Sequence, residues 1–130
     1  MTTRVLVAED VDAYRDTLVA VLELEDDLEV VAELAVGDRI VPAALEHHPD
    51  VALLDIDLPG TDGLTVAVEL RRRLPACRVL ILTGLATPDH AARALAAGVS
   101  GFLVKDIPAD DLVDAVRAAA RGERTFGAAG

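Results

Sequence analysis

Short apolar runs alternate with longer segments in which apolar residues recur at helical spacing. The runs are rich in Val, Leu and Ile, as buried strands are. They comprise Arg4–Ala8, Leu28–Ala35, Val51–Leu54, Arg78–Leu82 and Gly101–Val104. Because each run precedes a helix-like segment, the pattern predicts successive strand–helix units of an α/β protein.

Five helices are predicted between and after these strands, each bounded by capping or turn residues. The first follows the capping carboxylates of Asp10-Val11-Asp12 and runs to about Glu25; the second begins at Asp38 and stops before Pro49. The third spans about Leu64–Leu74, after turn residues that a helix interior does not favour. The fourth begins at Pro88-Asp89 and ends at Gly98, and the last leads from Pro108 to Gly122.

The unit count restricts the topology. Parallel strands joined by helices connect right-handedly, and five strands are too few for an eight-stranded barrel. An open, doubly wound, five-stranded parallel sheet in the flavodoxin-like order 2-1-3-4-5 is therefore expected, with five helices. Ligands bind such sheets at the carboxyl ends of the strands, at the switch point between strands one and three.

Chemically active side chains follow four of the five strands. Glu9 and Asp10 follow the first strand, Asp55 the third, Thr83 the fourth and Lys105 the fifth. Three carboxylates at one edge repel each other unless a cation lies between them, so a divalent metal is expected. An ionised Asp55 is a suitable nucleophile toward phosphorus, while Lys105 and Thr83 can contact phosphoryl oxygens.

Each of these residues has an ordinary interpretation when taken alone: helix capping, a turn, a strand-end hydroxyl or a solvated lysine. Their joint placement at four strand ends favours a site. The histidines, His47, His48 and His90, are expected on helical surfaces away from the strand ends, without a chemical role. Cys77 is the single cysteine, and a small buried hydrophobic role is expected for it.

Composition and charge narrow the class of protein further. The 130 residues are 52% hydrophobic and 27% charged, which suits one small domain. The net charge of −11 argues against nucleic-acid binding by this chain itself, because such binding draws on basic contacts to phosphate. No signal peptide or membrane-spanning apolar run is evident, so we expect a cytoplasmic protein with no membrane association.

The strand-end residues, together with DIDLPGTDGL (Asp55–Leu64) and GFLVKD (Gly101–Asp106), resemble the receiver domain of two-component response regulators. The resemblance covers essentially the whole chain. It implies that Asp55 accepts a phosphoryl group from a sensor histidine kinase. It also implies Mg²⁺ or Mn²⁺ bound by Asp10, Asp55 and the main-chain carbonyl of Asp57, with Glu9 assisting. Thr83 and Phe102 would form the conformational switch, and water would remove the phosphoryl group. A receiver of this kind is a signalling domain rather than an enzyme.

Other stretches resemble the NarL/FixJ-type (LuxR-class) transcriptional regulators: LEDDLEVVAE, LTGLATPDH and KDIPADDLVDAVRAAARGER. The expected organisation is a receiver over 1–122 and a linker over 123–130, with the DNA-binding output domain absent from this chain; a stand-alone receiver is the alternative. Phosphorylation is expected to promote homodimerisation through the first and fifth helices. Residues expected to face outward there are Val19, Leu24, Val113 and Ala118–Ala120.

Three other classes of protein fit this pattern less well. Asp55 and Asp57 form a DxD pair like the nucleophile motif of haloacid-dehalogenase phosphatases, but in that family the acidic metal pair follows the nucleophile, whereas Glu9 and Asp10 precede it. An interaction module with a degenerate site would not need the complete set of groups. A flavodoxin-like cofactor binder is disfavoured because no glycine-rich loop follows the first strand and tryptophan is absent.

Overall fold

The computed structural model describes residues 2–124, and its elements alternate as the sequence pattern predicts. The strands are β1 (Thr3–Ala8), β2 (Leu28–Leu34), β3 (Val51–Asp55), β4 (Arg78–Thr83) and β5 (Gly101–Val104). The helices are α1 (Asp12–Glu23), α2 (Ile40–His47), α3 (Gly63–Arg73), α4 (Pro88–Ala96) and α5 (Ala109–Ala120), with a 3₁₀ turn η1 (Gly37–Arg39) before α2.

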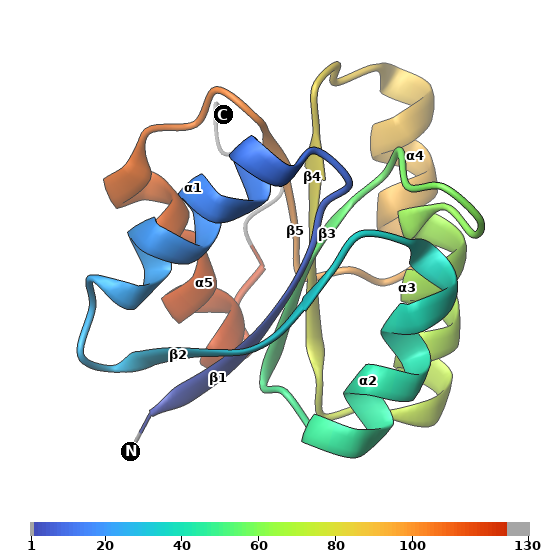
Figure 1. The fold of residues 1–130 in the computed structure, drawn as a ribbon. Helices are drawn as coiled ribbons and strands as arrows, with labels where there is room; N and C mark the ends of the chain where they lie inside the picture. The colour runs from blue at the N-terminus through green and yellow to red at the C-terminus, as the bar shows by residue number, and fades with distance from the viewer. Residues whose placement is uncertain (1, 125–130) are drawn as a thin grey trace.

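All five strands are parallel, in the order β2-β1-β3-β4-β5. Helices α1 and α5 cover one face of the sheet, and α2, α3 and α4 cover the other (Figure 1). The predicted flavodoxin-like, doubly wound architecture is thus confirmed. Its switch point lies between β1 and β3, where the register pairs Ala8 with Leu54.

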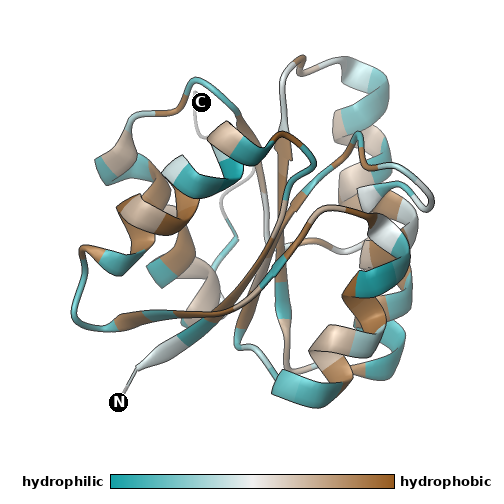
Figure 2. Cartoon of the chain, in the orientation of Figure 1, coloured by the Kyte–Doolittle hydropathy of each residue, from teal (hydrophilic) through white to brown (hydrophobic). Residues whose placement is uncertain are grey.

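Two apolar clusters, one on each face of the sheet, make up the core. Alternate strand residues supply them, because successive side chains of a strand point to opposite faces. Leu6, Leu54 and Ile81 pack under α2, α3 and α4, while Val7 and Leu53 pack under α1 and α5. Figure 2 shows the strands mostly brown and the outward helix faces largely teal. Burial of each such side chain contributes about 1.5–3 kcal/mol, which fixes the strand ends that carry the polar residues.

The start of α1 differs from the expected capping pattern. Val11 occupies the N-cap position, and no side chain there caps the helix. The Val11 amide instead donates to Oε2 of Glu9 at 2.9 Å, so the buried Glu9 takes the part expected of Asp10 or Asp12. The helix also ends at Glu23 rather than Glu25.

The segment before α2 corrects a second boundary. Asp38 lies in the 3₁₀ turn, and α2 begins only at Ile40. The Asp38 carboxylate accepts hydrogen bonds from the amide and hydroxyl of Thr61, 23 residues away, rather than capping its own helix. A tertiary contact with the loop after β3 has therefore displaced a local one.

The prediction that Val113 and Ala118–Ala120 of α5 face outward is wrong in part. Val113 is buried with α1 and the sheet, as are Ala118 and Ala119, whereas Ala120 is exposed. Half of the twelve residues of α5 are buried, and its apolar residues Leu112, Val113, Ala115, Val116 and Ala119 belong to the core cluster shared with α1 and the sheet. On α1, Val19 is half-buried, and Leu24, just beyond its end, is exposed.

Cys77, the helices' membrane-spanning capacity and the predicted linker were the remaining expectations. Cys77 is buried, and burial, followed by the charge of Asp50, raises the pKa of its thiol to about 11, consistent with a hydrophobic role. Within residues 2–124, none of the helices combines the length and apolar character needed to cross a bilayer. Most of the predicted linker, from residue 125 onward, lies outside the described residues.

Candidate functional site

The carboxyl ends of β1, β3 and β5 bring three charged residues to one edge of the sheet, the upper edge in Figure 1. Glu9 directly follows β1, Asp55 is the last residue of β3, and Lys105 directly follows β5. They are separated by up to 96 positions in sequence, from residue 9 to residue 105. The strand order brings them to the same part of this edge, because β3 lies beside β1, and β4 and β5 follow β3 in the sheet.

Lys105 joins the two buried carboxylates directly. Its Nζ lies 2.7 Å from Oε1 of Glu9 and 2.9 Å from Oδ2 of Asp55. The side chains of Glu9 and Asp55 are only 0% and 2% exposed, so water screens these pairs weakly. Burial lowers the pKa of the Lys105 ammonium, but its close contacts with the Glu9 and Asp55 carboxylates outweigh that effect and raise the pKa above its ordinary value. Lys105 is therefore charged at neutral pH.

Tyr14 on α1 supports this lysine and was not assigned a site role from the sequence. Its hydroxyl donates to the carbonyl of Lys105 at 2.7 Å, and Nζ of Lys105 lies 5.2 Å from the centre of its ring. Burial raises the pKa of Tyr14, so the phenol remains a donor. In the sequence Tyr14 was indistinguishable from the other residues of the buried face of α1; only the fold places it against β5.

The backbone around Asp55 is tightly packed. Oδ1 of Asp55 accepts a hydrogen bond from the Asp57 amide at 3.1 Å. A Cβ on Gly63 would lie 2.1 Å from the carbonyl oxygen of Asp55, so only glycine fits where α3 begins. Asp62 caps that helix by accepting from the Leu64 and Thr65 amides. These contacts hold the Asp55 carboxylate at the end of β3 rather than in a loose turn.

Three carboxylates at this edge lie close enough to share one ion. One ligand oxygen from each of Glu9, Asp10 and Asp55 falls within 4.8 Å of the others. Oε1 of Glu9 is buried and has no well-oriented hydrogen bond, although Lys105 lies nearby. Three negative charges against the single positive charge of Lys105 leave the cluster anionic, and hard carboxylate oxygens are the ligands that Mg²⁺ prefers. These residues therefore fit a divalent cation.

Thr83 and Phe102 lie on the neighbouring strands β4 and β5. Thr83 ends β4 and is buried; its hydroxyl donates to the carbonyl of Leu85 at 3.0 Å and accepts from the Leu85 amide at 3.2 Å. Thr83 is thus committed to its own loop rather than to Asp55. Phe102 on β5 is half-buried and packs against the cluster that contains Ile81, its partner in register.

One histidine lies nearer to the strand ends than predicted. Nδ1 of His90, in the first turn of α4, is 3.3 Å from the carbonyl of Leu85 in the loop that follows Thr83. The expectation that all three histidines lie away from the strand ends is wrong for His90, because α4 begins at that edge. His48 caps the end of α2, with a positive φ of 49°.

Comparison with known proteins agrees with this geometry. Residues 5–117 match the response regulator receiver domain family. The chain is 38% identical over 122 residues to the transcriptional regulatory protein DesR of Bacillus subtilis, covering 94% of this chain and 60% of DesR. It is 36% identical over 126 residues to the response regulator protein VraR of Staphylococcus aureus, covering 97% of this chain and 60% of VraR. The chain thus spans about three fifths of the length of these relatives.

Solved structures give the same result. The signal receiver domain of the putative response regulator NarL from Mycobacterium tuberculosis superposes with a TM-score of 0.91 at 36% identity, covering 94% of this chain and 98% of that domain. A LuxR-family DNA-binding response regulator from Staphylococcus aureus gives a TM-score of 0.86 at 28% identity, covering 91% of this chain and 98% of that one. This chain therefore belongs to the response regulator receiver domain family, within the NarL/FixJ (LuxR-class) subfamily.

Proposed function

We propose that Asp55 accepts a phosphoryl group from the phosphohistidine of a sensor histidine kinase, with Mg²⁺ or Mn²⁺ as cofactor. The observation that carries the proposal is the paired, buried carboxylate of Asp55 at the sheet edge, 2.9 Å from the Lys105 ammonium and within one ion's reach of Glu9 and Asp10. Asp10, Asp55 and the main-chain carbonyl of Asp57 would hold the ion, with Glu9 assisting.

In the transfer, an oxygen of Asp55 attacks phosphorus. An O–P bond forms while the donor's N–P bond breaks, and the donor imidazole leaves as a neutral ring because its other nitrogen keeps a proton. Lys105, whose ammonium lies 2.9 Å from the Asp55 carboxylate, would pair with a phosphoryl oxygen. The ion, when bound, offsets negative charge on the phosphoryl oxygens. No residue is needed as a general base, because Asp55 reacts as the carboxylate.

The acyl phosphate is removed by water, which attacks phosphorus, regenerates the Asp55 carboxylate and releases inorganic phosphate. Two residues near the site bear on the rate of this step. Asp57 adds a carboxylate two positions after the acceptor, and Leu85 presents an exposed apolar side chain two positions after Thr83.

The signal would leave the site through Thr83 and Phe102. A phosphoryl group on Asp55 offers the Thr83 hydroxyl a charged acceptor in place of the Leu85 carbonyl, to which it now donates. Movement of Thr83 vacates space on the face of the sheet where Phe102 is half-buried. The two packings form a two-state element whose balance phosphorylation shifts.

The output would be homodimerisation through α1 and α5, passed to a DNA-binding domain in the part of the relatives that this chain does not match. Leu24, 80% exposed just beyond the end of α1, is the apolar residue that supports such a contact. Sedimentation of the phosphorylated protein should show a dimer that Leu24→Glu weakens. Val68→Glu, on α3 at the opposite face, is the matched control, and equal effects of the two changes would place the interface elsewhere.

Phosphoryl transfer itself is tested with a small-molecule phosphodonor and Mg²⁺. Intact-mass analysis should show one added phosphate in the wild type and in Asp57→Asn, and none in Asp55→Asn. Chelation of Mg²⁺ should abolish the addition. Phosphate incorporation in Asp55→Asn would overturn the assignment, and incorporation that is independent of divalent ions would overturn the metal's part.

A further inference from the structure

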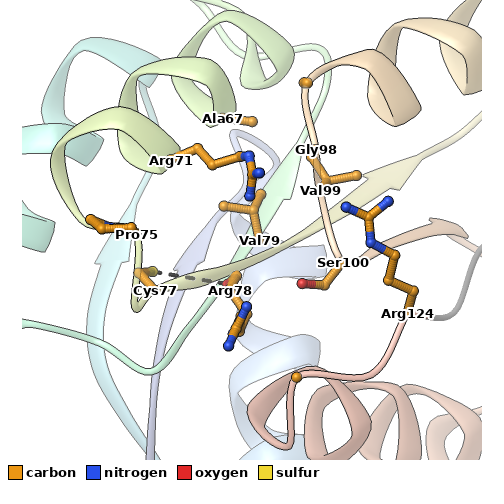
Figure 3. Close-up of a pocket in the computed structure, with 12 residues that line it drawn as sticks. Ala67, Arg71, Pro75, Cys77, Arg78, Val79, Gly98, Val99, Ser100 and Arg124 are labelled. Carbon is orange, nitrogen blue, oxygen red and sulfur yellow. Dashed lines mark hydrogen bonds between the residues drawn. The ribbon is translucent and has the colours of Figure 1, made fainter.

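A second polar pocket lies at the opposite end of the sheet from Asp55. It is bordered by the end of α3, the start of β4, the loop from α4 to β5 and the turn after α5, and it opens to solvent. Its volume is about 40 Å³. Figure 3 shows Arg71 entering from α3, with the Ser100 hydroxyl directed toward the same space and Arg124 approaching from the C-terminal segment.

Three arginines line this pocket: Arg71, Arg78 and Arg124. Among residues 2–124, no carboxylate lies within ion-pair distance of their guanidinium groups. Neighbouring arginines behave differently, since Arg72 and Arg73 on the same turn of α3 both pair with Glu69. All three arginines are exposed, and in a chain with a net charge of −11 three arginines around one pocket without an ion-pair partner among residues 2–124 are an exception.

The ends of α3, α4 and α5 meet near this pocket, and their partial negative charges account for part of the clustering. Each helix C-terminus carries roughly half a negative charge, so three supply about −1.5 against the three positive charges of the arginines. About one and a half positive charges remain. The pocket is therefore electropositive after the helix ends are counted, and an anion entering it gains more than it loses.

The backbone of Gly98 leaves room in the pocket for the Arg71 side chain. Gly98 has a positive φ of 75°, and a Cβ there would lie 2.3 Å from Nε of Arg71, so the glycine makes room for the guanidinium group. Ser100, which is 8% exposed, also lines the pocket, and its hydroxyl can donate a hydrogen bond to a bound anion.

We propose that this pocket binds a small tetrahedral oxyanion of the phosphate or sulfate type. Guanidinium groups match such anions with paired N–H donors, and the Ser100 hydroxyl supplies a further donor. The volume corresponds to about three water-sized volumes, which suits a single oxyanion and is far below the ~300 Å³ of pockets for organic ligands. The site does not depend on phosphorylation of Asp55.

The test is a titration with inorganic phosphate, followed by ¹H–¹⁵N NMR, without divalent ions and at constant ionic strength. The Gly98, Ser100 and Gly122 amides should shift saturably, and potassium chloride should produce no comparable shift. Arg71→Gln should weaken the affinity about tenfold, because hydrogen bonds between charged groups dominate such binding. The matched control is Arg72→Gln, whose arginine is paired with Glu69 outside the pocket.

Two further arms separate the possible sources of a response. Asp55→Asn should leave the shifts unchanged, which excludes phosphate bound at the phosphoacceptor edge. A parallel titration with sulfate distinguishes a general oxyanion site from one selective for phosphate, and either result supports the pocket. Shifts that rise linearly without saturation, that chloride reproduces, or that Arg72→Gln reduces as much as Arg71→Gln would overturn the proposal.

Discussion

Removing the ammonium of Lys105 should strongly destabilise the domain when no divalent ion is present. Lys105→Met keeps most of the aliphatic stem but leaves Glu9 and Asp55, which are 0% and 2% exposed, without their shared cation. Breaking a buried ion pair on one side costs about 3–5 kcal/mol, because the remaining charge is uncompensated. Lys105 itself is 26% exposed, so water offsets part of this, and a loss near 3 kcal/mol is expected.

Urea unfolding in the presence of a chelator measures the loss as a shift in the free energy of unfolding. The control is Arg117→Met, which removes the same charge from a pair with Glu25 and Asp27 at the surface, where screening keeps the effect smaller. Addition of Mg²⁺ should narrow the gap between Lys105→Met and the wild type, because the ion restores positive charge beside the carboxylates.

A double variant isolates the cause. Asp55→Asn in the Lys105→Met background removes one of the two unpaired charges, so it should recover part of the lost stability. If Lys105→Met costs no more than Arg117→Met in chelator, or if Asp55→Asn recovers nothing, then the paired carboxylates are not the source of strain at this edge.

Three other changes have separate readouts. Asp10→Asn should reduce the rise in melting temperature that millimolar Mg²⁺ gives the wild type, and equal rises would remove Asp10 from the metal site. Asp62→Ala should cost about 1 kcal/mol at pH 7 through loss of the α3 cap. Burial raises the pKa of Asp62, but hydrogen bonds from Thr65 and Leu64 outweigh it and hold the pKa below 3.8. This stabilisation is therefore present above pH 3.8 and lost as the pH falls through the lowered pKa; a difference that persists in acid would contradict it. Phosphorylation should change hydrogen exchange over residues 88–116, and Thr83→Ala should suppress that change; identical exchange in both states would exclude the switch.

The strand ends were predictable because their geometry is set by topology. Once the apolar runs are taken as parallel strands in the order 2-1-3-4-5, Glu9, Asp55 and Lys105 must share one edge. In the structure the Lys105 ammonium lies within 3 Å of a carboxylate oxygen of Glu9 and of Asp55. Their separation of dozens of residues in the sequence does not matter, because the order and the parallel direction of the strands bring their carboxyl ends together.

Residues whose role depends on packing between elements were not predictable. Tyr14 looks like any residue of a helix face until β5 lies beside it, and Asp38 looks like a helix cap until Thr61 competes for its carboxylate. Val113 was expected to face outward because α5 has more apolar residues than one stripe needs. In the structure the sheet and α1 cover a face of α5 wide enough to include Val113, which a hydrophobic pattern along one helix does not reveal.

Chemical mapping of the phosphorylated residue tests the role of Asp55 most directly. Borohydride reduces an aspartyl phosphate to homoserine but leaves a free carboxylate unchanged. After treatment with a small phosphodonor and Mg²⁺, reduction and digestion with trypsin, the peptide spanning residues 40–71 should carry homoserine at position 55 and aspartate at position 57. The assignment of Asp55 as the phosphoacceptor would be contradicted by homoserine at position 57 or position 10, or by a phosphorylated sample that contains no homoserine.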